Sequence, residues 1–203
     1  MKIICIGRNY GEHAKELGNA IPEEPVVFMK PPSAMIPLPG PITLPSFSDD
    51  VHHEVELVYE IGRKGGKAIA DKVTLGLDLT ARDVQQELKA KGLPWEKAKA
   101  FDGSVYVAEL RPAMDSFPKG HHIEFLLKKN GHVVQSGHSA QMLFDVDTLI
   151  AHVERYMRLD AGDLLFTGTP SGVGRLAPGD RLEGYLLGEL LFDLAVEAAS
   201  SAG

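Results

Sequence analysis

Residues 51–61 read VHHEVELVYEI, and this stretch decides the expected fold class. Its side chains change character at every second position, which is the period of a β-strand. One face of the strand would carry His53, Val55, Leu57, Tyr59 and Ile61, and the other face the acids Glu54, Glu56 and Glu60. Residues 74–79 read TLGLDL and predict a second strand. The chain is therefore expected to be built around a β-sheet.

Short strands and a few helices are predicted around this sheet. Further strands are expected at 2–6, 123–127, 132–135, 164–167, 180–187 and 190–196. Asn130-Gly131 lies between two of them and favours a two-residue hairpin turn. Helices are expected at 9–18 with Asn9 as N-cap, at 80–92 with Ala81, Val84 and Leu88 on the apolar side, and at 146–157. The pattern favours a mainly β fold.

Glycine and proline punctuate the chain, with 21 Gly and 13 Pro in 203 residues. Eight of the prolines fall within residues 22–45, which predicts an extended, ordered arm with little helix. The sequence shows no repeat, low-complexity tract or flexible linker. We therefore expect a small N-terminal segment at 1–45 and a larger β domain at 46–203.

Composition excludes several classes of protein. The 21 basic and 28 acidic side chains give a formal net charge of −7, and no basic block is present, which argues against nucleic-acid or anionic-membrane partners. Cys5 is the only cysteine, so an internal disulfide and a multi-cysteine metal site are excluded. The sequence contains no apolar run of membrane-spanning length and no secretion signal at its start, so we expect a cytoplasmic protein.

The strongest candidate site combines Glu54 and Glu56 with Asp78. Carboxylates at alternate positions of a strand project to the same side, and Asp78 lies opposite the apolar face of the second strand. Three carboxylates brought together repel one another unless a cation joins them. Hard oxygen ligands suit Mg²⁺ or Mn²⁺, whereas the lack of cysteine ligands beyond Cys5 and of a His-x₃-His spacing disfavours zinc. On spacing alone, the two glutamates could equally form the solvated face of an amphipathic strand.

Other polar residues could surround such a site. His13 and Glu16 are three residues apart on the first predicted helix, so the carboxylate could hold the imidazole as a general base, or both could be solvated. Arg82 at the start of the second helix could receive a carboxylate ligand or pair with a neighbouring acid. Lys99 lies between apolar residues and could point into a site or extend from the edge of the core.

Residues 166–174 read FTGTPSGVG and follow a predicted strand. The loop exposes backbone N–H groups that could cradle an anion. It is neither a phosphate-binding P-loop nor a nucleophile elbow, because the required lysine and serine spacings are missing. Ser171 is therefore interpreted as a turn residue.

These motifs together resemble the fumarylacetoacetate hydrolase family, in its short single-domain acylpyruvate hydrolase and oxaloacetate decarboxylase branch. The resemblance covers nearly the whole chain, because six motifs occur in the family's order. They are GRNY at 7–10, FMKPPSA at 28–34, HHEVE at 52–56, LDLTARDVQ at 77–85, GLPW at 92–95 with Lys99 and Asp102, and TGTPSGVG at 167–174. The implied fold is a mainly β (α+β) mixed β-sandwich roll with a few short helices, usually a homodimer.

The resemblance implies a role for each matching residue. Glu54, Glu56 and Asp78 match the family's Mg²⁺ or Mn²⁺ ligands, and His13 and Glu16 its catalytic dyad on a lid helix. The other matches are the catalytic Lys99, which with Arg82 and Gln85 holds the 1-carboxylate and 2-oxo end of the substrate, and the substrate-binding positions Thr169, Arg8 and Tyr10.

The implied reaction is divalent-metal-dependent hydrolysis of a C–C bond in acylpyruvates, 2,4-dioxo acids such as acetylpyruvate or fumarylpyruvate, giving pyruvate and a carboxylic acid. Oxaloacetate decarboxylation and 2-oxo acid tautomerisation or isomerisation use the same kind of site and remain alternatives. A metal-binding structural protein is the non-enzyme alternative. After Asp102 the sequence reads GSVYVA where relatives usually have a proline, so the residues at the distal end of the substrate are expected to differ.

Overall fold

The computed structural model describes residues 1–113 and 122–199. Its largest sheet has the strand order β2-β1-β12-β5-β6-β8, and β9 pairs with Lys72 and Val73 of β6. These strands are β2 (Val26–Lys30), β1 (Ile3–Gly7), β12 (Leu164–Phe166), β5 (Val55–Lys64), β6 (Lys67–Asp78), β8 (Val105–Val107) and β9 (Arg111–Pro112). The two strands predicted first, β5 and β6, are antiparallel neighbours at its centre.

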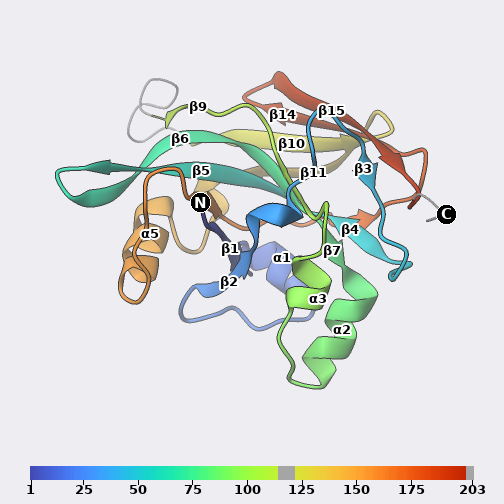
Figure 1. Cartoon of the computed structure of the whole chain (residues 1–203), viewed down its shortest axis with the longest axis horizontal. Helices are drawn as coiled ribbons and strands as arrows, with labels where there is room; N and C mark the ends of the chain where they lie inside the picture. Colours follow the sequence, from blue (N-terminus) through green and yellow to red (C-terminus); the bar gives the residue numbers. More distant parts are fainter. Residues whose placement is uncertain (114–121, 200–203) are drawn as a thin grey trace.

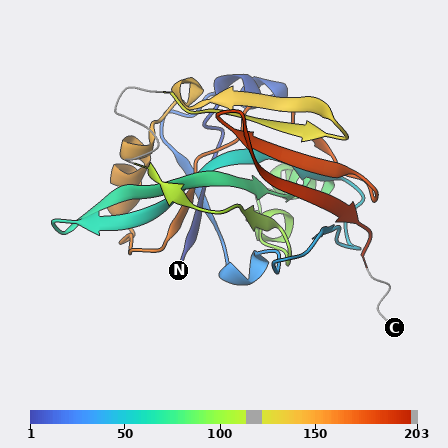
Figure 2. The ribbon, with the colours of Figure 1, turned by 90° about the horizontal axis from the view of Figure 1, so that it is seen from above.

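A second sheet packs against the first (Figure 1). Its strands, in order, are β11 (His132–His138), β10 (Glu124–Lys129), β14 (Arg181–Leu186), β15 (Glu189–Glu197) and β3 (Ile42–Thr43). A smaller sheet consists of β13 (Gly174–Arg175), β4 (Val51–His53) and β7 (Thr80–Ala81). From above, the β5–β6 hairpin extends beyond the second sheet at its turn (Figure 2).

The main apolar core lies between the two large sheets. It contains Leu57 and Leu75 from the first sheet and Phe125, Leu182 and Phe192 from the second, all at most 4% exposed. Burying such side chains on both inner faces is the main driving force for a β-sandwich. The expectation of a mainly β fold with a few short helices is confirmed.

The helices lie outside the sandwich. Those of the described residues are α1 (Gly11–Glu16), α2 (Arg82–Ala90), α3 (Glu96–Lys99) and α5 (Val146–Glu154), with 3₁₀ turns at Pro32–Ala34 and Ser139–Gln141. Asp145 caps α5 by accepting a hydrogen bond from the Thr148 N–H at 2.8 Å. None of the helices in residues 1–113 and 122–199 is long and apolar enough to cross a membrane.

Several local predictions need correction. Tyr10, rather than Asn9, is the N-cap of α1, because the Asn9 amide donates instead to the carbonyl oxygens of Phe144 and Thr167. The β5–β6 register shifts between Glu60 and Ile61, so Ile61 packs in the cluster around α5 and not on the face of Tyr59.

The buried side of α2 also differs from the prediction. Its buried side chains are Arg82, Gln85 and Leu88, whereas Val84 is only half-buried. This helix therefore turns a polar face inward, toward the site described next.

The hairpin at Asn130-Gly131 is confirmed, with φ of 53° and 79° at its two turn residues. The proline-rich arm is mostly extended and contains β2 and β3. Because β2 and β1 pair with each other in the largest sheet and β3 pairs with β15, the N-terminal segment contributes strands to both large sheets. A domain boundary at residue 45 stays a prediction.

Candidate metal centre and catalytic pocket

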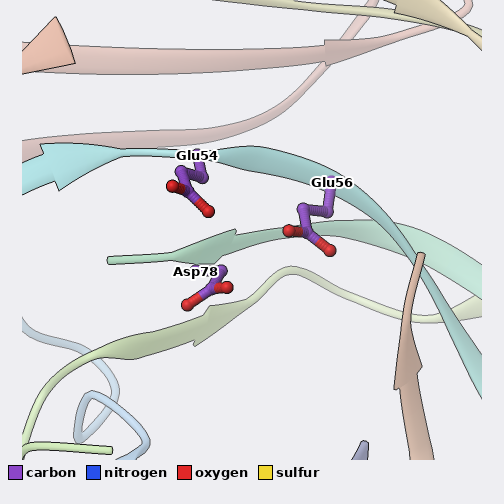
Figure 3. A group of neighbouring side chains, drawn as sticks. All are labelled: Glu54, Glu56 and Asp78. Carbon is purple, nitrogen blue, oxygen red and sulfur yellow. The ribbon is translucent and has the colours of Figure 1, made fainter. Parts of the chain in front are cut away.

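Glu54, Glu56 and Asp78 meet where β5 begins and β6 ends. Their backbones are brought together by the β5–β6 pairing, which includes a hydrogen bond from the Asp78 N–H to the Glu54 carbonyl oxygen at 2.9 Å. Each offers one carboxylate oxygen, and these three atoms lie within 4.8 Å of one another. Figure 3 shows the side chains converging. All three residues are at most 4% exposed, so the interpretation of the glutamates as a solvated strand face is wrong.

Cationic side chains surround two of the three carboxylates. Lys99 Nζ lies 2.8 Å from Glu54 Oε2 and 2.7 Å from Asp78 Oδ2. The Arg82 guanidinium also contacts Glu54. On the other side, Lys30 Nζ lies 2.5 Å from Asp78 Oδ1 and donates to the carbonyl oxygens of Leu79 and Ser104. Glu54 and Asp78 are therefore already compensated by charges of the protein.

Glu56 differs from its neighbours. Its carboxylate accepts a hydrogen bond from the Gly168 N–H at 2.7 Å, but within residues 1–113 and 122–199 it has no ion-pair partner. Burial, followed by the negative charges of Asp78 and Glu54, raises the pKa of Glu56 well above its usual value. Burial also opposes ionisation of Glu54, but Lys99 and Arg82 outweigh it and hold that pKa well below its usual value.

A buried carboxylate without a counter-charge, beside two others, fits a bound divalent cation. The three oxygen donors are of the type that Mg²⁺ and Mn²⁺ prefer. Glu54, Glu56 and Asp78 thus fit the divalent metal that the sequence predicts.

The predicted dyad forms on α1. His13 Nδ1 lies 3.1 Å from Glu16 Oε2, and the other oxygen of Glu16 accepts a hydrogen bond from the Gly172 N–H at 2.9 Å. His13 is 6% exposed and lines the same pocket as the three carboxylates. With Nδ1 engaged by Glu16, the opposite ring nitrogen is left to exchange a proton with a ligand.

The pocket gathers most of the predicted site residues from distant parts of the chain. Besides the carboxylates and His13, its lining includes Arg8, Arg82, Gln85, Lys99 and Thr169. Arg82 donates to Gln85 Oε1 at 2.7 Å, and its Nε has no hydrogen-bond partner among the described residues. An unpartnered, buried guanidinium N–H group suits a ligand carboxylate.

Tyr10 is not brought to this pocket. It is 2% exposed, packs edge-on against Phe125 with ring centroids 6.5 Å apart, and lines a different hollow together with Leu143 and Pro170. Arg8, two residues earlier, has a φ of 59°, and the intervening Asn9 is tied to residues 144 and 167. The chain therefore directs Arg8 to the pocket and Tyr10 to the core.

Two positioning residues were not predicted. Lys30 lies within the FMKPPSA motif at 28–34, but a lone lysine on a strand gives no sign that it will contact Asp78. Gln135 of β11 is 1% exposed; its Oε1 accepts from the Val55 N–H, and its Nε2 donates to Thr169 Oγ1 at 2.8 Å and to the Pro170 carbonyl oxygen at 2.9 Å. It joins the start of β5 to the loop after β12.

Comparison with known proteins agrees with these features. The family described as fumarylacetoacetate (FAA) hydrolase C-terminal matches residues 2–191. The mitochondrial oxaloacetate decarboxylase of Dictyostelium discoideum is 43% identical, covering 95% of this chain and 93% of its own. The mitochondrial oxaloacetate tautomerase FAHD1 of Bos taurus is 39% identical, covering 96% and 91%.

Among solved structures, the fumarylpyruvate hydrolase of Pseudomonas aeruginosa in complex with Mn²⁺ and pyruvate superposes with a TM-score of 0.87. Its sequence is 36% identical, and the match covers 98% of this chain and 90% of that one. The similarity therefore extends over the whole fold and includes the segments that form the pocket.

Proposed function

The chain belongs to the fumarylacetoacetate hydrolase family, and from this premise we propose that it is a Mg²⁺- or Mn²⁺-dependent enzyme that moves a proton on a 2-oxo acid, with oxaloacetate keto–enol tautomerisation as its main reaction. One observation carries the proposal: a buried trio of carboxylates that fits a divalent cation shares its pocket with the His13–Glu16 dyad. The choice of oxaloacetate is supported by the names of relatives about 40% identical.

Glu54, Glu56 and Asp78 would hold the ion. When bound, it supplies positive charge to the carboxylate and 2-oxo oxygens of the substrate and stabilises charge that develops there. Arg82, through its free Nε, and Gln85 would hold the 1-carboxylate. Burial opposes the charge of Lys99, but the negative charges of Asp78 and Glu54 outweigh it and raise the pKa of Lys99, so this side chain stays protonated in the pocket.

His13 would carry out the proton transfer. Its free ring nitrogen takes a proton from C3 as the C2 carbonyl gains negative charge, and returns that proton to the C2 oxygen, so that a C–H bond is exchanged for an O–H bond. Glu16 would hold Nδ1 and stabilise the transient imidazolium, as a carboxylate does beside a catalytic histidine.

Hydrolysis of acylpyruvates is the second candidate, supported by the similarity to a fumarylpyruvate hydrolase. In that reaction His13 would instead take a proton from water as the water attacks the C4 carbonyl, and the C3–C4 bond would break with its electron pair passing to C3. Decarboxylation of oxaloacetate would need no base, because carbon dioxide leaves from C4.

A substrate panel separates these reactions. Protein freed of metal and reloaded with Mg²⁺ or Mn²⁺ is assayed for oxaloacetate tautomerisation, carbon dioxide release, and pyruvate formation from acetylpyruvate and fumarylpyruvate. We expect metal-dependent tautomerisation that His13→Ala abolishes without lowering the unfolding temperature. Turnover that survives both metal removal and His13→Ala would contradict the proposal.

The non-enzyme alternative predicts a different result. A structural metal protein would bind Mn²⁺ through the three carboxylates, and His13→Ala would leave this binding unchanged. We also propose that the chain forms a homodimer, on the basis of the family resemblance; sedimentation equilibrium measures this directly.

A further inference from the structure

A pair of cations lines the same pocket as the carboxylate trio. Arg8 follows β1, Lys89 lies in the last turn of α2, and Trp95 precedes α3; all three line the pocket that contains Glu54, Glu56 and Asp78. The Arg8 guanidinium carbon lies 6.0 Å from the centroid of the Trp95 ring, and Lys89 Nζ lies 5.5 Å from it. One indole ring therefore holds both cations.

Neither cation is neutralised by an acidic side chain of the described residues. Within residues 1–113 and 122–199, Arg8 and Lys89 form no ion pair with an acidic side chain. By contrast, Lys91, two residues after Lys89, pairs with Glu87 at 2.5 Å. Lys89 is half-buried. Burial, followed by the positive charges of Arg8, Arg82 and Lys99, lowers its pKa to about 8. The cation–π contact with Trp95 offsets only part of this repulsion.

Lys89 also lies on the same helix as Arg82, the residue proposed to hold the 1-carboxylate of the substrate. Arg82 and Lys89 are seven residues apart, which is nearly two helical turns, so their side chains leave the same face of α2. Their Cα atoms are separated by about 10 Å along the helix axis. Long side chains at both ends of that span can hold the two carboxylates of a short dicarboxylate between them.

We propose that Arg8 and Lys89, held by Trp95, form a second anion subsite that binds the distal carboxylate of a dicarboxylic 2-oxo acid. The inference rests on the proposed function, in which Arg82 and Gln85 hold the 1-carboxylate. It selects dicarboxylic substrates, such as oxaloacetate or fumarylpyruvate, over a monocarboxylate such as acetylpyruvate. Specificity arises because a neutral distal group leaves two half-buried cations without a counter-charge.

The test compares two substrates that differ only in the distal charge. Oxaloacetate and its 4-ethyl ester are assayed with Mn²⁺-loaded wild-type protein, Lys89→Met, Arg8→Gln and Lys89→Arg. A hydrogen-bonded charge contact corresponds to about a 10–100-fold difference, so Lys89→Met and Arg8→Gln are each expected to lower kcat/KM for oxaloacetate by about that factor. The kcat/KM for the ester should change by less than about twofold in these two variants. Lys89→Arg, which keeps a positive charge at this position, should retain the preference for oxaloacetate.

Lys97→Met is the matched control. Lys97 is an exposed lysine two residues after Trp95 that does not line the pocket, so its loss should leave the ratio of the two substrates unchanged. Equal losses for oxaloacetate and the ester, or an unchanged ratio in Lys89→Met, would overturn the subsite.

Failure of the subsite is distinguishable from failure of the function. If wild-type protein loaded with Mn²⁺ neither converts oxaloacetate nor binds pyruvate in a calorimetric titration, the proposed function is wrong and the subsite falls with it. If it binds pyruvate and converts both oxaloacetate and the ester equally well, the subsite alone is wrong. Unfolding curves of each variant show that folding is intact.

Discussion

Glu56 is the residue on which metal binding should depend most directly. Lys99 and Arg82 approach Glu54, and Lys30 and Lys99 approach Asp78, but Glu56 has only the Gly168 N–H as its hydrogen-bond donor within the described residues. An added cation is therefore the main compensation available for its charge.

Replacing Glu56 by glutamine separates the metal requirement from folding. Glu56→Gln keeps the shape and removes a repulsive charge, so the metal-free variant should unfold at the same or a higher temperature than the metal-free wild type. Its affinity for Mn²⁺, measured by calorimetry, should fall by more than the about 10–100-fold typical of outer-shell changes. Glu60→Gln, on the same strand beside Lys72, is the control. Equal Mn²⁺ affinity in the wild type and Glu56→Gln would remove Glu56 from the site.

Lys89 makes substrate preference depend on pH. Its pKa is about 8, so the ammonium is present below that value and is lost as the pH rises through it. The positive charges of Arg8, Arg82 and Lys99 act on Lys89, opposed by the negative charge of Glu54, and arginine keeps its charge throughout this range. The preference for oxaloacetate over its 4-ethyl ester should therefore be full near pH 7 and decline above pH 8.

The pH profile is measured as the ratio of kcat/KM for the two substrates. In Lys89→Met the ratio should be low at every pH, and in Lys89→Arg the decline should disappear. A wild-type ratio that stays constant from pH 7 to pH 9.5 would show that Lys89 does not contact the distal group.

At the scale of elements, α1 is joined to the loop after β12 by one carboxylate. Glu16 contacts His13 Nδ1 with one oxygen and accepts from the Gly172 N–H with the other. Gly172 has a φ of 97°, and a Cβ there would lie 2.0 Å from the Val134 carbonyl oxygen, so the loop requires glycine at this position. Gln135 fixes the same loop through Thr169 and Pro170.

Glu16→Gln tests this arrangement without moving α1. The amide can still accept from the Gly172 N–H, but its NH₂ group opposes the Nδ1–H that the working tautomer of His13 presents. We expect kcat to fall by about 10²–10⁴-fold, the range for loss of general acid–base catalysis, with little change in Mn²⁺ affinity or KM. Glu12→Gln on the exposed side of α1, beside Lys15, should have no effect. A change confined to KM would contradict the dyad.

The sequence predicts elements better than it predicts the contacts between them. Alternation located β5, and the Asn130-Gly131 turn located the β10–β11 hairpin, because both signals lie within one segment. The shift at Glu60/Ile61 was missed, since a bulge depends on the partner strand.

The same distinction holds in the site. The pairing of β5 with β6 made Glu54, Glu56 and Asp78 predictable as a group, although their burial depends on the whole fold. Lys30 and Gln135 were missed because their partners lie far away in the chain, at 78 and at 55 and 169. Tyr10 was misplaced because the turn at Arg8 sends adjacent residues in different directions.

At the scale of the whole molecule, a net charge of −7 coexists with a pocket that suits anions. The described lining of that pocket has Arg8, Arg82, Lys89 and Lys99 against three carboxylates, and a divalent ion would add to the positive side. These residues come from the end of β1, from α2 and α3, and from the region where β5 begins and β6 ends, so only the folded chain creates the local field. The overall charge therefore says little about the ligand.

Because the three carboxylates are assembled only by folding, divalent metal should stabilise the entire chain. A ligand at 100 times its Kd adds about 2.7 kcal/mol to the free energy of unfolding if it binds only the folded state. For a chain of this size, that corresponds to a rise of about 5–11 °C in Tm, since each kcal/mol shifts Tm by about 2–4 °C. Thermal unfolding after metal removal, repeated over a series of Mn²⁺ concentrations, should show a Tm that climbs with the logarithm of concentration in the wild type and in Glu60→Gln. The rise should be absent in Glu56→Gln over the same range. A wild-type Tm that stays constant at every Mn²⁺ concentration would mean that the trio does not bind the ion in the folded protein.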